Sequence, residues 1–178
     1  MKHEWDPGRL DVRAFARAAG QLQGVTPLTA WPRLAEDAVH TDGQVHWSLI
    51  GSTRPVMGGA DQVWLTLTAQ LNMALTCQRC LLPVTCPLQV ERAFRFVADE
   101  ALAAQEDEAS QEDVLVWNNA LDALELIEDE LIMALPMIPM HEACDGERAP
   151  TSGDLASSDE KRPHPFAVLS KLRSDKTG

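Results

Sequence analysis

The sequence predicts an α+β fold, in which an antiparallel β-meander is packed by helices. Apolar and polar residues alternate over much of 45–96, as expected for strands that bury one face. The segment 121–135 instead places its apolar residues on a 3.6-residue period, as in an amphipathic helix. Short connections between the alternating segments favour antiparallel neighbours. We expect a single domain over 1–144, followed by a flexible polar tail over 145–178.

Two helices are expected before the sheet. Asp6-Pro7 is typical of a cap followed by proline in the first helical turn, and Gly20 is typical of a helix end. A second short helix is expected over 31–38. Three arginines recur every fourth residue along one side of the first helix: Arg9, Arg13 and Arg17. They form either a solvated face or a contact for RNA phosphates or for the acidic part of the chain.

The strands are predicted from residue 45 onwards. A strand over 45–50 and a loop over 51–59 precede the long alternating run 63–75, which predicts a strand with one buried face. After a turn that contains two cysteines, alternation resumes over 88–96, with Glu91, Arg92 and Arg95 expected to point outward. A short strand over 114–116 would complete the sheet.

A helix should cover this sheet and begin near Asp122. Asp122 is a suitable N-cap, and Glu125 follows at the spacing of a capping box. The helix should end near Leu135, because Pro136 cannot continue its hydrogen bonds. Four acidic residues are expected on the rest of its surface, with Glu128 close to the edge of the apolar stripe: Glu125, Glu128, Asp129 and Glu130.

Charge is unevenly distributed along the chain, whose formal net charge is −12 at pH 7. Residues 99–147 hold fifteen Asp or Glu and no Lys or Arg. Such a block repels phosphate backbones and attracts basic proteins, although acidic segments also serve solubility alone. Within it, 99–113 is expected to be a mobile acidic segment, either a loop or a solvated helix.

The tail combines a polar stretch with a short apolar one. Residues 145–163 are polar and rich in Pro, Ser and Gly, which predicts disorder. The apolar segment 165–173 is expected either to dock on its own domain or to fold on contact with a partner.

The four cysteines are expected to be reduced, because the sequence starts without an apolar export segment. No apolar run is long enough to span a membrane, so we expect a cytoplasmic protein. Cys77 and Cys80 form a Cys-x-x-Cys knuckle, which supplies half of a tetrahedral metal site. The other half is either His141 with Cys144, or Cys144 with Cys86. We expect structural zinc there, against alternatives of redox chemistry and of plain reduced thiols.

Several ordered motifs resemble one known family. They are Leu75-Thr-Cys77-Gln-Arg-Cys80, then Glu128-Asp-Glu-Leu-Ile-Met-Ala-Leu-Pro136, then Pro139-Met-His141 with Cys144, and the ending Pro165-Phe166-Ala-Val-Leu169. Together they resemble the bacterial YceD-like proteins, a family named for large ribosomal RNA subunit accumulation. The resemblance implies a role in synthesis, processing or stability of 23S ribosomal RNA, without nuclease activity or catalytic residues. It marks Cys77, Cys80, Glu130, Pro136, His141 and Cys144 as family positions, but not Cys86.

Two modes of action then remain open. In the first, Arg79, Arg92 and Arg95 contact ribosomal RNA precursor directly, and binding weakens steeply with salt. In the second, the acidic block, including Glu128, Asp129 and Glu130, engages a basic ribosomal protein or assembly factor. The charge distribution favours the second. No other catalytic pattern is present in the sequence, so we expect a protein that is not an enzyme.

Overall fold

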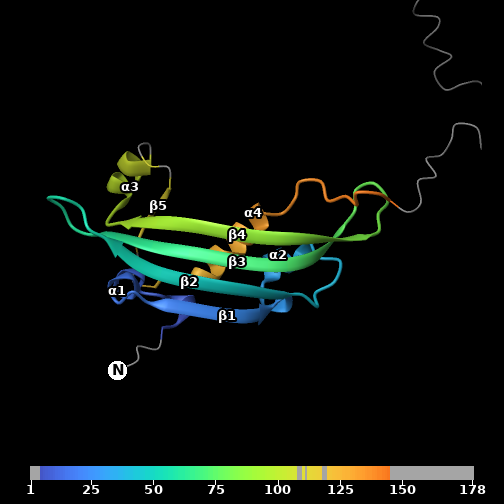
Figure 1. The fold of residues 1–178 in the computed structure, drawn as a ribbon, viewed down its shortest axis with the longest axis horizontal. Coiled ribbons are helices and arrows are strands. Elements are labelled where there is room, and N and C mark those ends of the chain that lie inside the picture. Colours follow the sequence, from blue (N-terminus) through green and yellow to red (C-terminus); the bar gives the residue numbers. More distant parts are fainter. Residues whose placement is uncertain (1–4, 108–109, 111, 118–119, 145–178) are drawn as a thin grey trace, which may run out of the picture. The chain divides into compact units, whose positions relative to one another are not determined.

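The computed structural model describes residues 5–107, 110, 112–117 and 120–144 (Figure 1). Its centre is a five-stranded sheet in which the strands follow sequence order. The strands are β1 (Gln21–Pro27), β2 (Gln44–Arg54), β3 (Gln62–Thr76), β4 (Pro83–Val97) and β5 (Asp113–Val116). Strands β1 to β4 form the predicted antiparallel meander, whereas β5 pairs with β4 in parallel and makes the sheet mixed. The predicted tail, 145–178, lies outside the described residues.

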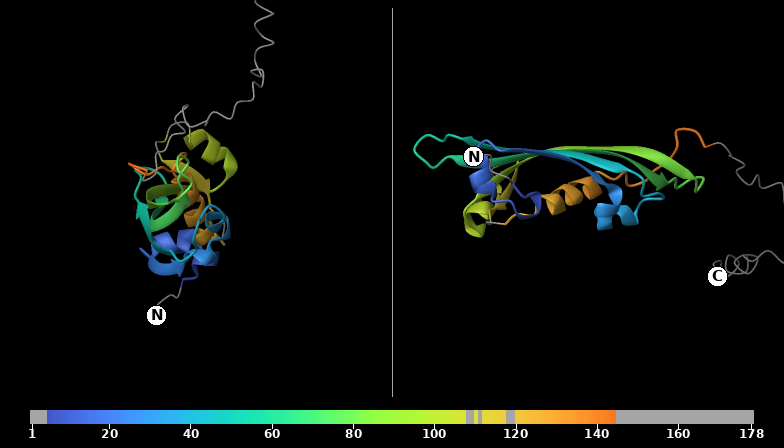
Figure 2. Two further views of the ribbon diagram at one scale, coloured as in Figure 1. Left: turned by 90° about the vertical axis from the view of Figure 1, so that its right-hand side faces the viewer. Right: turned by 90° about the horizontal axis from the view of Figure 1, so that it is seen from below.

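One face of the sheet is covered by helices along most of its length. On the covered face, Leu65 of β3 lies opposite Phe94 of β4, and both side chains are buried. Figure 2 shows the helices α1, α2 and α4 on this side of the sheet, where they share a single apolar core with the strands. The bounds of these helices are Val12–Arg17, Pro32–Glu36 and Ala123–Met133. The predicted α+β architecture is therefore confirmed.

The long helix predicted near the N-terminus is divided in two. Asp6 caps a short 3-10 turn, Pro7–Arg9, and Asp11 then caps α1 by accepting a hydrogen bond from the Ala14 N–H. Between them, the backbone of Leu10 pairs with Leu121 in both directions, at 2.8 and 3.0 Å. This long-range bridge holds Leu10 extended and interrupts the helix.

The division also separates the arginines that were expected to line up on one helix. Arg9 belongs to the 3-10 turn, while Arg13 and Arg17 belong to α1. The Arg13 guanidinium lies 5.0 Å from the ring centre of Trp117, in the geometry of a cation–π contact. The expected row of three on one helix face is therefore wrong.

Strand β1 was not predicted, whereas α2 was. A 3-10 turn, Leu28–Ala30, joins the two elements. In β1, which is an edge strand, Leu22 is only half-buried, and Val25 is more than half exposed because it lies opposite His46 on the face away from the core. The core-facing position Gly24 leaves room for the Trp47 ring of β2, since a Cβ atom there would lie 2.5 Å from that ring.

Helix α4 begins as the sequence predicts. Asp122 accepts hydrogen bonds from the N–H groups of Leu124 and Glu125, both at 3.0 Å. The helix ends at Met133, two residues before the predicted position. Its stripe of Ile127 and Leu131 is buried, as expected, but two of its acidic side chains, Glu128 and Glu130, are buried as well.

The acidic segment 99–113 contains a helix, α3 (Glu100–Asp107). This is the second of the two alternatives for the segment, and its mobility stays a prediction. Helix α3 lies within the crossover that a parallel β4–β5 pair requires. It packs Leu102 and Ala103 against Val97, Val114 and Val116, in a small cluster separate from the main core.

Within the described residues, no helix is long and apolar enough to cross a membrane.

Candidate metal centre

The Cys-x-x-Cys knuckle is a tight turn between the two longest strands. Cys77 directly follows β3 and is fully buried, whereas Cys80 is half-buried. The turn closes through hydrogen bonds from the Leu81 N–H to the Cys77 carbonyl and from the Cys77 N–H to the Leu82 carbonyl, each 2.9 Å. Leu81 has a φ of 62°, which is rare for a residue other than glycine. The turn is therefore held in a conformation that a free loop would avoid.

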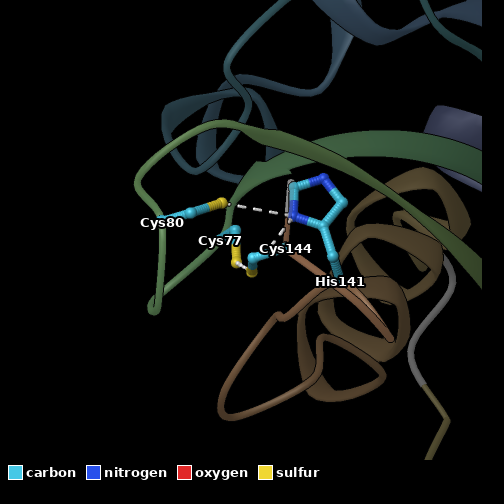
Figure 3. Close-up of side chains that lie close together, drawn as sticks. All are labelled: Cys77, Cys80, His141 and Cys144. Carbon is cyan, nitrogen blue, oxygen red and sulfur yellow. Dashed lines mark hydrogen bonds between the residues drawn. The ribbon is translucent and has the colours of Figure 1, made fainter. Parts of the chain in front are cut away.

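The chain after α4 brings the second half of the site to the knuckle. Its position is set by a 2.9 Å hydrogen bond from the Gln78 N–H to the Pro139 carbonyl. The His141 ring lies beside β4, with Nε2 3.0 Å from the Pro83 carbonyl. A carbonyl oxygen can only accept, so Nε2 carries the proton and the lone pair of a neutral ring is on Nδ1. In Figure 3 this Nδ1 faces the cysteine sulfurs.

Four side chains meet at this point: Cys77, Cys80, His141 and Cys144 (Figure 3). Their ligand atoms all lie within 4.8 Å of one another. The Cys77 and Cys144 sulfurs are 3.7 Å apart, and the Cys80 sulfur is 3.4 Å from His141 Nδ1. Tetrahedral zinc, with bonds of about 2.3 Å to sulfur, separates two thiolates by about 3.8 Å. The spacing of the cluster thus fits a tetrahedral ion.

The backbone around the knuckle also favours the thiolate form of one cysteine, Cys77. Burial acts to raise the pKa of Cys77, but the N–H groups of Cys80, His141 and Arg79 oppose it and lower the pKa to about 5. At Cys80 the balance is reversed. The Leu82 N–H favours the thiolate, but burial and the neighbouring Cys144 and Cys77 sulfurs raise the pKa of Cys80 above its ordinary value. A second negative sulfur is disfavoured without a cation between them.

Arg79 provides a positive charge beside the cluster. Its Nε lies 3.0 Å from the Cys144 sulfur, and its Nη2 donates to the His141 carbonyl at 3.3 Å. A divalent ion with three thiolates and one neutral imidazole carries a net charge of −1, which the Arg79 guanidinium offsets. Arg79, proposed from the sequence as an RNA contact, therefore lies against the cluster of cysteines and His141.

Cys86 lies apart from this cluster. It is a half-buried residue of β4, opposite Met73 of β3, and burial raises its pKa. Of the two alternatives for the second half of the site, the structure therefore brings together His141 with Cys144. With four protein ligands, a bound ion has no open position for substrate, which is the arrangement of a structural site.

The other two arginines proposed for RNA contact are paired with acidic residues. Arg92 lies opposite Leu67 in the sheet register, on the same face as the core and not on the opposite face as expected, although its side chain is exposed. It forms ion pairs with Asp113 and with Glu130, the latter at 3.3 Å. Arg95 pairs with Glu106 of α3.

The three acidic residues proposed as partner contacts on α4 also have partners within the domain. Glu128 and Asp129 both bind Arg33 of α2, and Glu130 binds Arg92. Burial raises the pKa of Glu130 against the influence of the Arg92 charge. The local sequence contains no pattern for these pairings, because each joins residues far apart in the chain. The orienting carbonyls of Pro83 and Pro139 were missed for the same reason.

Comparison with known proteins relates the chain to one family. A family model described as "Large ribosomal RNA subunit accumulation protein YceD" matches residues 65–173. A protein of Haemophilus influenzae (strain ATCC 51907 / DSM 11121 / KW20 / Rd) with that same description is 32% identical over 170 residues. The match covers 93% of this chain and 88% of that protein. No solved structure matches the chain.

Proposed function

Because the chain belongs to the YceD family of large ribosomal RNA subunit accumulation proteins, we propose that it is a non-enzymatic factor in ribosome biogenesis. Its role is to support the synthesis, processing or stability of 23S ribosomal RNA. Ribosome assembly takes place in the cytoplasm, and the protein acts there. In this proposal the metal centre holds structural zinc and keeps the knuckle and the segment 134–144 together.

The contact chemistry favours a basic protein over RNA. Residues 99–147 hold fifteen acidic residues without any Lys or Arg, which opposes approach to a phosphate backbone. The three arginines proposed for RNA contact are engaged within the domain: Arg79 at the metal centre, Arg92 by Asp113 and Glu130, and Arg95 by Glu106. The observation that carries the proposal is the combination of an acidic segment that contains no Lys or Arg with arginines that are engaged within the domain. A basic ribosomal protein or assembly factor is the partner it suits.

Crosslinking in growing cells tests the choice of partner. The tagged chain is irradiated with ultraviolet light, and attached RNA is sequenced while co-purified proteins are identified. We expect ribosomal proteins without RNA above background. Crosslinks clustered in 23S ribosomal RNA would make the chain a direct RNA ligand and overturn the proposed contact. Deleting the gene tests the process itself, and an unchanged ratio of 23S to 16S RNA would contradict the proposed function.

A further inference from the structure

Exposed apolar side chains gather around the metal centre. Five of the large apolar residues that the structure leaves more than half exposed belong to the knuckle or to the segment that reaches it: Leu81, Leu82, Met137, Ile138 and Met140. Met137 is 98% exposed. Figure 1 shows the orange segment that carries the last three running from α4 to the turn between β3 and β4. Exposed apolar groups concentrated in this way are typical of an interaction site.

An acidic hollow opens beside these residues. It has a volume of about 380 Å³ and lies between the end of α2, the end of β3 and the segment after α4. We call it the α2 hollow, and its lining includes Glu36, Asp37, Leu75, Gln78, Leu135 and Met137. Both acidic residues are exposed, and the described lining contains no Lys or Arg. Glu36 is the last residue of α2 and Asp37 is its C-cap, so the helix dipole adds to the negative potential there.

We propose that the α2 hollow and the apolar residues beside it bind a basic, amphipathic segment of a protein partner. This inference rests on the proposed function, in which the partner is a basic protein, and gives that partner a contact whose acidic groups lie outside the block 99–147. A Lys or Arg side chain suits the hollow, because its methylene stem can pack on Leu135 and Met137 while its charge meets Glu36 and Asp37. The exposed apolar residues then receive the apolar side chains of the same segment.

The composition of the surface supports this choice of partner. Methionine is flexible and polarisable, so Met137 and Met140 can adapt to apolar side chains of different shape. Acidic groups at the edge of an apolar contact select partners by charge and speed their association. The same acidic groups would repel an RNA backbone. The surface has a fixed shape, because the Gln78–Pro139 hydrogen bond and the cluster of cysteines and His141 join the segment that carries Met137 to the knuckle.

The test uses the full-length, zinc-loaded chain and a fluorescent 18-residue peptide of Leu and Lys in an amphipathic helical pattern. Fluorescence anisotropy measures its dissociation constant beside that of a matched peptide with Glu in place of Lys. We expect only the Lys peptide to bind. The double variant Glu36→Gln/Asp37→Asn should weaken binding about tenfold, through the loss of both charges that face the ligand.

A matched charge control separates this site from general attraction to an acidic protein. Asp61→Asn/Glu91→Gln removes the same charge from exposed positions outside the α2 hollow, in the loop before β3 and on β4. We expect this control to change the dissociation constant less than about twofold. An equal loss in the two double variants would overturn the proposal, since net charge alone would then explain the binding.

The apolar half of the surface has its own pair of variants. Met137→Ser/Ile138→Ser should weaken binding several-fold, whereas Met57→Ser should not, although Met57 is fully exposed as well. Unchanged affinity in the first variant would overturn the proposal. So would sedimentation that shows the chain to self-associate through this surface, with Met137→Ser/Ile138→Ser restoring the monomer, because a second copy would then be the occupant.

The outcome is distinguishable from failure of the proposed function. If the Lys peptide does not bind, and deletion of the gene still lowers 23S RNA, the surface is wrong and the biogenesis role stands. If deletion leaves 23S RNA unchanged, the proposed function fails whatever the peptide does.

Discussion

The carboxylate of Glu128 in α4 accepts hydrogen bonds from both the backbone N–H and the side chain of Arg33 in α2. Its Oε1 accepts the Arg33 N–H at 2.9 Å, and its Oε2 accepts from Arg33 Nε at 3.1 Å. The N–H of Leu34 also donates to Oε1, at 3.1 Å. Helix α2 lacks a side-chain cap of its own, because Trp31 occupies the N-cap position. A buried carboxylate from a distant helix thus satisfies the first N–H groups of α2.

Replacing Glu128 should therefore destabilise the fold. Glu128→Ala leaves two N–H groups and a guanidinium without their shared acceptor, and we expect the free energy of unfolding to fall by about 3 kcal/mol. Glu128→Gln keeps one acceptor oxygen and should lose less. Urea unfolding measures both. Glu125→Ala, on the exposed side of the same helix, should cost no more than about 0.5 kcal/mol. Equal losses at the two positions would contradict a capping role for Glu128.

The purified chain should contain one zinc ion, and Cys77→Ser should release it. Loss of a buried ligand opens the site, so the variant should also melt at a lower temperature. Elemental analysis and thermal melting measure the two effects. Cys86→Ser is the matched control and should keep the metal, because Cys86 lies outside the cluster.

The same variants distinguish zinc from redox chemistry. An oxidoreductase would lose turnover in Cys77→Ser and would have no metal to release. A wild-type chain purified without metal would exclude structural zinc.

Local patterns predicted the parts of the fold that short stretches of sequence determine. The period of two predicted β2 to β4, and Asp122 with Pro136 bounded α4 to within two residues. Strand β1 was not predicted, because an edge strand needs little apolar alternation. Gln23 and Val25 of this strand are both exposed. Strand β1 forms because it pairs with β2, and this pairing cannot be predicted from a local sequence pattern.

The cluster of Cys77, Cys80, His141 and Cys144 was predicted in part for the same reason. The spacings Cys77-x-x-Cys80 and His141-x-x-Cys144 mark two local pairs, each on a short turn or segment. Which pairs meet is decided by contacts over long sequence distances, such as the Gln78–Pro139 hydrogen bond. For Arg92, the residue type itself led to a wrong prediction. A charged residue in a strand suggests solvent, but the register places Arg92 on the covered face, where Glu130 pairs with it.

The depressed pKa of Cys77 gives a prediction for the metal-free chain. Because the pKa is about 5, the thiolate should be present at neutral pH, where an ordinary thiol is protonated. Absorbance at 240 nm, followed from pH 4 to 8, should show one thiolate with a midpoint near pH 5. This step should be missing in Cys77→Ser.

The same shift sets the sign of a stability effect. The folded pKa of Cys77 is below the unfolded value of 9.0, so the thiolate stabilises the metal-free fold fully above about pH 9. That contribution is lost as the pH falls towards 5. The melting temperature of metal-free wild type should therefore approach that of metal-free Cys77→Ser between pH 9 and pH 5. A constant difference across this range would contradict the depressed pKa.

Arg79 should strengthen metal binding without being a ligand. Its guanidinium lies 3.0 Å from the Cys144 sulfur and offsets the net negative charge of an ion bound by three thiolates. We expect Arg79→Gln to weaken zinc affinity about tenfold, as is typical when a group that supports a ligand is removed. Competition with a chromogenic chelator measures this affinity. Arg54→Gln is the control, because Arg54 stacks on Trp64 and lies outside the cluster. Equal zinc affinity in the two variants would mean that the Arg79 charge does not act on the metal, and its contact with Cys144 would then serve only to hold the segment 134–144 against the knuckle.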